Sequence, residues 1–265
     1  MKILFITLSN IGDCILTLPV LDALIDKYPA AEFSVVTSLR AKEVFKETPF
    51  VKKIIIYDKK NPLKEKLKFI RQLCSENYDL VLDLRHTILP FILKAKRLNR
   101  LFSSKRYSHM RERHLYQIAI RDYPLPIKRH FFMNVKNEYE RYKDYIVVAP
   151  GARSHLKRWS IDGFAQVCDR IIQENGLSII LLGDSDDKAI VDEIISKMAN
   201  TAINLAGKTS LVELAALLKD ATLVISTDSA CMHLASYLNR PIVAIFGPTS
   251  DKKYGPWSKK NGIVK

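Results

Sequence analysis

The stretch ISTDSACMHLA, residues 225–235, combines residue types that can bind an anion. An apolar run ends in Asp228 and Ser229, and His233 follows just over one helical turn later. An Asp or Ser between a strand and a helix is a good N-cap, so the pattern has a purely structural interpretation. If Asp228 caps the helix, the free N–H groups and the positive dipole end of its first turn form a phosphate-binding position. Ser229 and His233 then share one helix face.

A second candidate site is PGARSHLKRW, residues 150–159, which follows another hydrophobic run and contains Gly151, Arg153, Lys157 and Arg158. Glycine lets the backbone approach a ligand closely, and the cations neutralise phosphate charge. The pattern is neither a Walker A loop nor a GxGxxG fingerprint. It therefore indicates either an anion site or a surface turn with exposed cations.

A third candidate is Asp13, which follows Gly12 in the loop after the first hydrophobic run. A carboxylate there can accept the proton of an attacking hydroxyl group. The alternative is a helix cap for a helix that begins near Cys14. The three carboxylates of GDSDD, residues 183–187, are typical of a turn and helix cap rather than a metal site.

These residues must be positioned by alternating β-branched runs and helical patterns, which predict an α/β protein with parallel sheets covered by helices. We expect strands at 2–7, 32–38, 52–58, 80–85, 145–149, 178–184, 203–207, 222–227 and 241–247, and helices at 15–28, 161–175, 187–198, 211–219 and 229–238. The elements form two successive series, joined by a proline-containing segment at 122–144. We therefore predict two Rossmann-like domains, 1–140 and 141–265. Ligands bind outside the carboxyl ends of parallel strands, so the candidate loops should line a shared cleft.

Composition narrows the classes of partner. The chain has 265 residues and a formal net charge of +14, which indicates an anionic partner such as a nucleotide, nucleic acid, phosphorylated glycan or acidic lipid. No apolar run is long enough for a membrane span, and no signal peptide is evident, so we expect a cytoplasmic protein. The four cysteines include no CxxC pair and are interpreted as reduced thiols, mostly buried.

The basic residues concentrate in one segment. Residues 94–114 hold eight Lys or Arg against the single Glu112. Such a run is either a solvated face or, with its interleaved apolar residues, a contact with an anionic membrane. No nucleic-acid-binding signature accompanies it.

Three segments resemble motifs of a known family. Residues 204–250 closely resemble the C-terminal signature of glycosyltransferase family 9, the ADP-heptose:lipopolysaccharide heptosyltransferases. SNIGDCILTLPVLDAL (9–24) resembles the N-terminal motif of that family, and PGARSHLKRWSIDGFAQV (150–167) its central one. The three occur in the family's order, and the resemblance is faint between about 85 and 145.

The resemblance implies a GT-B fold in which the N-terminal domain holds the acceptor and the C-terminal domain the nucleotide-sugar donor. It implies an inverting transfer of heptose or a related sugar from a nucleotide-diphosphate sugar, ADP-heptose foremost, to a lipopolysaccharide core or related glycan, without metal or cofactor. Asp13 matches the catalytic base, and Lys157 matches the lysine at the donor phosphates. Asp228, Ser229 and His233 match the D-[ST]-G-x-x-H donor motif.

Further donor contacts are expected at Gly151, Arg153, Ser154, Gly183 and Ala230, and acceptor or membrane contacts at Gly12, Arg97, Arg100, Lys105 and Arg106. Two departures from the family pattern stand out. Ala230 replaces the motif's glycine, and the added methyl lies where backbone is expected to approach phosphate. The chain also ends soon after GPTS, so its C-terminal domain is expected to be short.

These departures leave an alternative open, namely a catalytically silent relative that binds a nucleotide or a glycan. A nucleic-acid-binding protein is suggested only by the net charge and is not expected. The leading interpretation is a cytoplasmic glycosyltransferase, peripheral at the inner face of the cytoplasmic membrane, where residues 94–114 meet anionic lipid or a phosphorylated acceptor.

Overall fold

The computed structural model describes residues 1–265 except 98–107, 119–127, 138, 140–141 and 143. The chain divides into two compact units, Met1–Met133 (unit 1) and Asn134–Lys265 (unit 2). The sequence analysis places this boundary near residue 140. Both units are α/β with parallel sheets, which confirms the predicted class.

Unit 1 is built on a five-stranded parallel sheet with the order β3-β2-β1-β4-β5. Its strands are β1 (Lys2–Ile6), β2 (Glu32–Thr37), β3 (Val51–Ile56), β4 (Leu80–Asp83) and β5 (Lys96–Arg97). Its helices are α1 (Ile11–Lys27), α2 (Glu43–Lys46), α3 (Leu63–Ser75), α4 (Leu89–Ile92) and α5 (Met110–Tyr116). The strand order reverses direction between β1 and β4, so the topological switch point lies where these two strands end.

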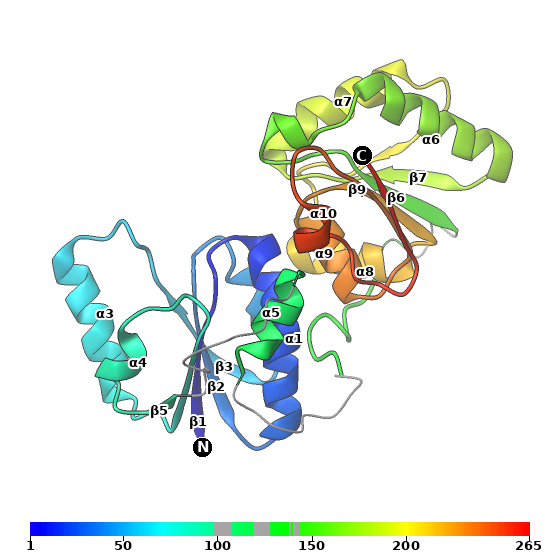
Figure 1. The fold of residues 1–265 in the computed structure, drawn as a ribbon. Coiled ribbons are helices and arrows are strands. Elements are labelled where there is room, and N and C mark those ends of the chain that lie inside the picture. Colours follow the sequence, from blue (N-terminus) through cyan, green and yellow to red (C-terminus); the bar gives the residue numbers. More distant parts are fainter. Residues whose placement is uncertain (98–107, 119–127, 138, 140–141, 143) are drawn as a thin grey trace. The chain divides into compact units, whose positions relative to one another are not determined.

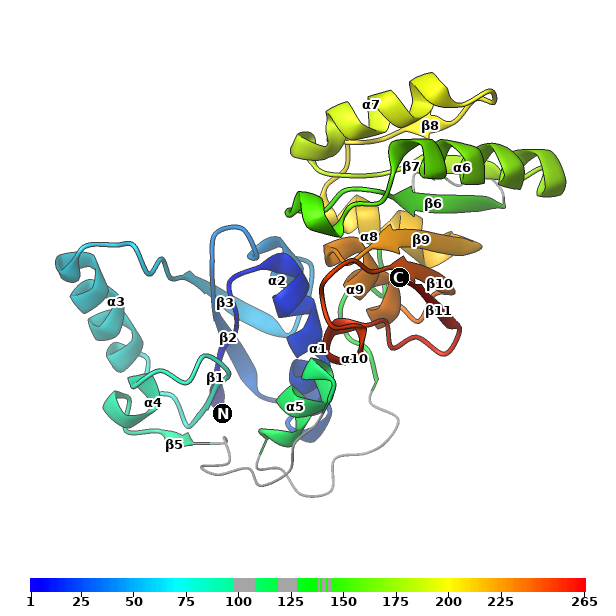
Figure 2. The same ribbon diagram turned by 45° about the horizontal axis from the view of Figure 1, so that its top comes forward.

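The central strand β1 buries both of its faces, because successive side chains point to opposite sides of a strand. Leu4 and Ile6 pack with Phe69 and Leu73 of α3 in one apolar cluster. Helix α1 lies on the opposite side from α3 and α4, with α5 beside it (Figures 1 and 2). Nearly every residue of α1 from Cys14 to Ile25 is buried, as expected for a helix that is apolar on all sides.

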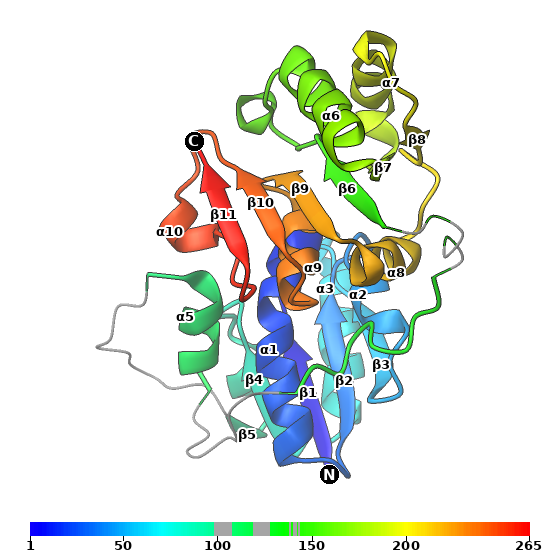
Figure 3. The same ribbon diagram turned by 90° about the vertical axis from the view of Figure 1, so that its right-hand side faces the viewer.

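Unit 2 has a six-stranded parallel sheet with the order β11-β10-β9-β6-β7-β8 (Figure 3). Its strands are β6 (Tyr145–Ala149), β7 (Ser178–Leu181), β8 (Ile203–Asn204), β9 (Leu223–Thr227), β10 (Ile242–Ile245) and β11 (Asn261–Val264). Its helices are the short 3-10 helices η1 (His155–Lys157) and η2 (Ser185–Asp187), and α6 (Ile161–Asn175), α7 (Lys188–Lys197), α8 (Leu211–Asp220), α9 (Ala230–Tyr237) and α10 (Asp251–Tyr254). Here the switch point lies between β6 and β9.

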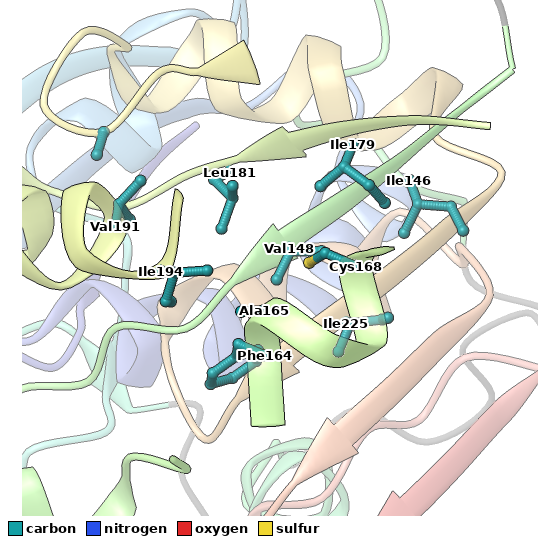
Figure 4. Close-up of a cluster of buried hydrophobic side chains, with 11 residues drawn as sticks. Ile146, Val148, Phe164, Ala165, Cys168, Ile179, Leu181, Val191, Ile194 and Ile225 are labelled. Carbon is teal, nitrogen blue, oxygen red and sulfur yellow. The ribbon is translucent and has the colours of Figure 1, made fainter. Parts of the chain in front are cut away.

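The core of unit 2 under α6 and α7 is a single apolar cluster. Figure 4 shows Val148 and Leu181 of the sheet facing Phe164 and Cys168 of α6, with Ile194 of α7 beside them. Local signals fix the ends of these helices. The Ser160 hydroxyl accepts from the Gly163 N–H at the start of α6, and Gly176 ends α6 with φ +65°, a left-handed conformation that favours glycine.

The predicted element boundaries agree best with the structure in unit 2, where α6 spans the predicted range 161–175. Helix α1 begins at Ile11 rather than near residue 15, because Asn10 occupies the N-cap position. The elements that were not predicted are the helices α2, α3, α4, α5 and α10 and the strands β5 and β11.

The predictions about the cysteines and about membrane spans can be compared directly with the structure. All four cysteines are free thiols, and only Cys74 is exposed, which confirms the sequence interpretation. Burial raises the pKa of Cys14, Cys168 and Cys231 to about 12, so these thiols stay protonated. In the part of the chain that the structure describes, no helix is both long and apolar enough to cross a membrane.

Candidate active site

The candidate residues of each unit gather at its switch point. In unit 2 the segment after β6 holds Gly151 to Lys157, and the segment after β9 holds Asp228 and Ser229. In unit 1 Asp13 lies in the helix after β1, next to the loop after β4. Ligands of open parallel sheets bind outside the strands' carboxyl ends where the strand order reverses. Each unit therefore places its candidate residues where a ligand is expected.

The central contact of the unit 2 site joins Lys157 to Asp228. The Lys157 Nζ atom donates to Asp228 Oδ2 at 2.7 Å. The Asp228 side chain is 5% exposed and that of Lys157 is 31% exposed, so the cation reaches toward solvent from a buried carboxylate. This charge-assisted bond fixes the lysine at the ends of β6 and β9.

Helix α9 begins differently from the sequence prediction. Its N-cap is Ser229, in an extended conformation, and the Ser229 side chain makes no capping hydrogen bond. Asp228 therefore does not cap the helix. That prediction was wrong, because the carboxylate is taken up by Lys157 instead. The Ser229 Oγ lies 3.1 Å from Ser226 Oγ, and Ala230 is the first helical residue. The first-turn N–H groups of α9 therefore receive no bond from the N-cap side chain, as an anion site requires.

His233 is buried one turn into α9, with 6% of its surface exposed. Its Nε2 lies 4.0 Å from Asp228 Oδ1, beyond hydrogen-bond distance. Its ring stacks on Trp257, with centroids 5.9 Å apart and planes 27° apart. His233 thus lines the buried side of the Lys157–Asp228 pair.

Asp187 is a residue of this region that the sequence analysis did not single out. A Cβ atom placed on Gly151 would lie 2.1 Å from its carboxyl carbon, and one on Gly183 would lie 2.6 Å from its Cβ. Arg158 approaches the same carboxylate at 3.9 Å. A methyl group at either glycine would therefore displace the Asp187 side chain. Burial raises the pKa of Asp187, and the neighbouring Asp184 carboxylate adds to the effect.

The remaining residues of the loop after β6 are accessible. Arg153 is exposed, and Ser154 is half-buried at the N-cap of η1 without a side-chain capping bond.

The GDSDD turn behaves as expected from the sequence, with Asp184 and Asp187 forming a capping box around η2. Among the described residues, no group of three or more His, Cys, Asp or Glu is placed to hold a metal ion.

In unit 1, Asp13 lies in the first turn of α1 and not at its cap. The Asn10 amide Nδ2 donates to Asp13 Oδ2 at 2.8 Å. The capping alternative for Asp13 is therefore wrong. A carboxylate in the first turn is favoured by the helix dipole, and Asp13 is only half-buried, so it remains accessible to a ligand. Gly12 precedes it in the same turn.

The loop after β4 lies at the same switch point. The buried Asp83 carboxylate accepts from the N–H groups of Arg85 and Thr87 and from the Thr87 hydroxyl, at 2.6–2.8 Å. These bonds hold His86 at φ +55°, a left-handed conformation that is uncommon outside glycine. Such constrained backbone is concentrated at functional sites. This loop is not among the predicted site segments, although LDLRHT (82–87) ends a buried strand in polar residues.

Only part of the basic segment, residues 94–114, lies among the residues that the structure describes. Arg97 lies in β5 at the edge of the sheet, whereas Arg100, Lys105 and Arg106 lie outside the described residues. The end of the segment forms α5, where His114 is buried with 4% of its surface exposed. It is therefore not a solvated face throughout.

Comparison with known proteins identifies the family. Residues 121–265 match the model of glycosyltransferase family 9 (heptosyltransferase). The chain belongs to glycosyltransferase family 9. The family resemblance expected from the three sequence motifs is thereby confirmed.

Relatives and solved structures agree with this assignment. The chain is 28% identical over 285 residues to lipopolysaccharide heptosyltransferase 3 of Escherichia coli (strain K12). This alignment covers 94% of the chain and 83% of that protein. The structure of E. coli ADP-heptose lps heptosyltransferase II matches with a TM-score of 0.81 and 24% identity, covering 100% of this chain and 90% of that one. E. coli heptosyltransferase WaaC with ADP matches with a TM-score of 0.80 and 21% identity, covering 100% and 93%. The predicted GT-B fold is confirmed.

Proposed function

We propose that this member of family 9 transfers a heptose from ADP-heptose to a lipopolysaccharide core or related glycan, with inversion at the anomeric carbon. The observation that carries the proposal is the placement of Asp13 and of the Lys157–Asp228 pair at the switch points of their respective sheets. The matched relatives are lipopolysaccharide heptosyltransferases, and one matched structure contains ADP.

Unit 2 is the donor-binding unit in this proposal. The Lys157 ammonium group and the uncapped N–H groups at the start of α9 provide positive charge for a diphosphate. Asp228 holds the ammonium group in place, and Ser229 offers a hydroxyl at the same helix end. The exposed Arg153 and the half-buried Ser154 extend this surface on the loop after β6.

Unit 1 is the acceptor-binding unit. Asp13 acts as general base and takes the proton of the acceptor hydroxyl as its oxygen forms a bond to the anomeric carbon of the heptose. On the opposite face of that carbon, the bond to the diphosphate oxygen breaks and ADP departs with the electron pair. Attack opposite the leaving group inverts the anomeric centre.

The charge that grows on departing ADP requires stabilisation. Lys157 and the helix end would supply fixed positive charge to a diphosphate bound beside them, and such preorganised charge is usually the largest single contribution to transition-state stabilisation. We therefore propose that these groups take the role that a divalent metal has in other glycosyltransferases, and that no cofactor takes part. The proposal predicts turnover that is unchanged by EDTA.

The alternative is a relative that binds nucleotide but does not turn over. It is suggested by Ala230, whose methyl group stands at the first position of α9 in place of the motif's glycine. Calorimetry with ADP, UDP, GDP and CDP should show the tightest binding for ADP, and proton NMR of the product should show the anomeric configuration opposite to the donor's. Binding of ADP without product would favour the silent relative, and a retained configuration would contradict the inverting mechanism.

We further propose peripheral contact with an anionic membrane surface through residues 94–114. Each cation near such a surface adds about 1 kcal/mol of binding. Co-sedimentation with vesicles that contain phosphatidylglycerol should exceed that with neutral vesicles and should weaken as salt is added. Equal sedimentation with both kinds of vesicle would contradict the contact.

A further inference from the structure

Helix α5 and the loop after β4, which flank the start of α1, contain several buried polar atoms that lack hydrogen-bond partners among the described residues. They are both ring nitrogens of His114, Oε1 of Gln117 and Nη1 of Arg85. Buried polar atoms in folded proteins are nearly always hydrogen-bonded, and exceptions call for an explanation such as an absent ligand. Such atoms on two elements that meet at the switch point of unit 1 therefore point to a binding site.

His114 and Gln117 reach this region from α5. Helix α5 lies along α1 in all three ribbon views (Figures 1–3). The Asp13 carboxylate is close enough for its charge to affect the pKa of His114, as is His86 from the loop after β4. The Gln117 Nε2 lies 3.1 Å from His86 Nε2, which ties α5 to that loop and directs the amide. The two elements thus meet at the switch point of unit 1.

His114 is neutral in this setting. Burial lowers its pKa to about 4, against a smaller opposing effect of Gln117. A neutral imidazole has one N–H donor and one acceptor nitrogen, and the Gln117 Oε1 is a further acceptor. A sugar hydroxyl, which both donates and accepts, matches this set of groups.

Arg85 adds a positive charge. Its guanidinium carbon lies 5.1 Å from the centre of the Tyr57 ring, and its Nη1 atom has no hydrogen-bond partner among the described residues. The nearby Asp83 carboxylate is occupied by backbone and hydroxyl donors of the same loop. A half-buried guanidinium group is suited to a phosphate or carboxylate, with which it forms paired hydrogen bonds.

We propose that Arg85, His114 and Gln117 bind the acceptor glycan beside Asp13, with Arg85 on an anionic group of the glycan and His114 and Gln117 on a sugar hydroxyl. The inference rests on the proposed function, because it takes unit 1 as the acceptor-binding unit. It adds a requirement that the resemblance to the family does not contain, namely an acidic group within reach of Arg85 when the acceptor lies at Asp13.

The test is acceptor binding without donor, measured by calorimetry on the full chain. The ligand is a deacylated core oligosaccharide from a heptose-deficient lipopolysaccharide. The wild type should bind it, and His114→Leu should raise the dissociation constant about 10- to 100-fold, since it removes hydrogen bonds to a buried group. The same variant should unfold at the same or a higher temperature, because it replaces an unsatisfied polar group with an apolar one. A purely structural histidine would give the opposite result, a lower unfolding temperature with unchanged acceptor affinity.

His130→Leu serves as the matched control. His130 is also a histidine of unit 1, but it pairs with Asp26 at 2.8 Å near the other end of α1. Its replacement should lower the unfolding temperature and leave acceptor affinity unchanged. If His114→Leu fails to fold, His114→Gln and Gln117→Leu provide the same comparison. The expected loss of acceptor affinity is smaller for His114→Gln than for Gln117→Leu.

The anionic group is identified by modified ligands. Arg85→Met should weaken binding of the intact oligosaccharide, and Arg85→Lys should weaken it less. The penalty should disappear when the oligosaccharide has been dephosphorylated if the group is a phosphate, or when its carboxyl groups have been reduced if it is a carboxylate. A penalty that persists with both modified ligands would overturn the role of Arg85.

The outcomes separate this inference from the proposed function. Acceptor binding that depends on His114, in a chain that never releases ADP, would support the inference and refute heptosyl transfer. ADP release with unchanged acceptor affinity in all three variants would refute the inference alone. Absence of acceptor binding by the wild type would overturn the inference.

Discussion

Replacement of Lys157 by Met should separate the structural role of this lysine from its role in nucleotide binding. The Asp228 side chain is 5% exposed and loses its partner at 2.7 Å. Breaking a fully buried pair costs about 3–5 kcal/mol. Because the Lys157 side chain is 31% exposed and water can take the place of its ammonium group, we expect a smaller loss of about 2 kcal/mol. For a unit of this size, that is a decrease of about 6–8 °C in Tm.

The double variant Lys157→Met/Asp228→Asn completes the thermodynamic cycle. Asparagine removes the unpaired buried charge, so stability should return to within about 1 kcal/mol of the wild type. Asp228→Asn alone should cost less than Lys157→Met alone, because the lysine that it leaves behind can reach water. Urea unfolding followed by circular dichroism gives the free energies.

Nucleotide affinity should not follow stability in this cycle. If Lys157 contacts the diphosphate, the double variant regains stability but binds ADP as weakly as Lys157→Met. Recovery of ADP affinity in the double variant would refute the role at the phosphates. Lys197→Met is the matched control, because Lys197 pairs with the exposed Asp162 at 2.8 Å and its loss should leave stability nearly unchanged.

Three further predictions follow from single contacts. Gly151→Ala should cost about 1–3 kcal/mol and weaken ADP binding in calorimetry, because the new methyl group would overlap the Asp187 carboxylate. The wild type should lose stability as the pH falls from about 6.5 toward 4, because burial lowers the pKa of His114 to about 4. His114→Leu should abolish this loss. In urea titrations, the difference in unfolding free energy between His114→Leu and the wild type should therefore grow by about 2–3 kcal/mol over that range, and a constant difference would contradict this prediction. Tyr145→Phe should cost about 1–2 kcal/mol, because the buried hydroxyl donates to the Leu217 carbonyl at 2.7 Å, and an unchanged urea midpoint would refute this.

The sequence predicted most of the fold because its signals are local. The apolar runs of the central strands and the caps of helices such as α6 are encoded within a few residues. The start of α1 was misplaced because SNIGD contains several residues that can begin a helix, and the structure uses Asn10. Helix α3 was missed because its lysines conceal the spacing of Phe69 and Leu73, which are buried only through contact with the sheet.

The site residues were predicted by type but not by partner. Asp228 was expected to cap α9, but it pairs with a lysine that is distant in the sequence, a contact that only the adjacency of β6 and β9 creates. Asp187 has the capping role that its neighbours indicate, and its contact with Gly151 follows from the fold. His114 lies in a segment whose charge suggests exposure, but packing of α5 against α1 buries it.

The most direct test of the account is ADP release by the purified chain, measured with ADP-heptose and a heptose-deficient lipopolysaccharide acceptor. The wild type should release ADP only when the acceptor is present. Asp13→Asn should lose about 10²–10⁴-fold in rate, as expected for loss of a general base, while binding ADP with unchanged affinity. An Asp13→Asn variant that keeps the wild-type rate would show that Asp13 is not the general base.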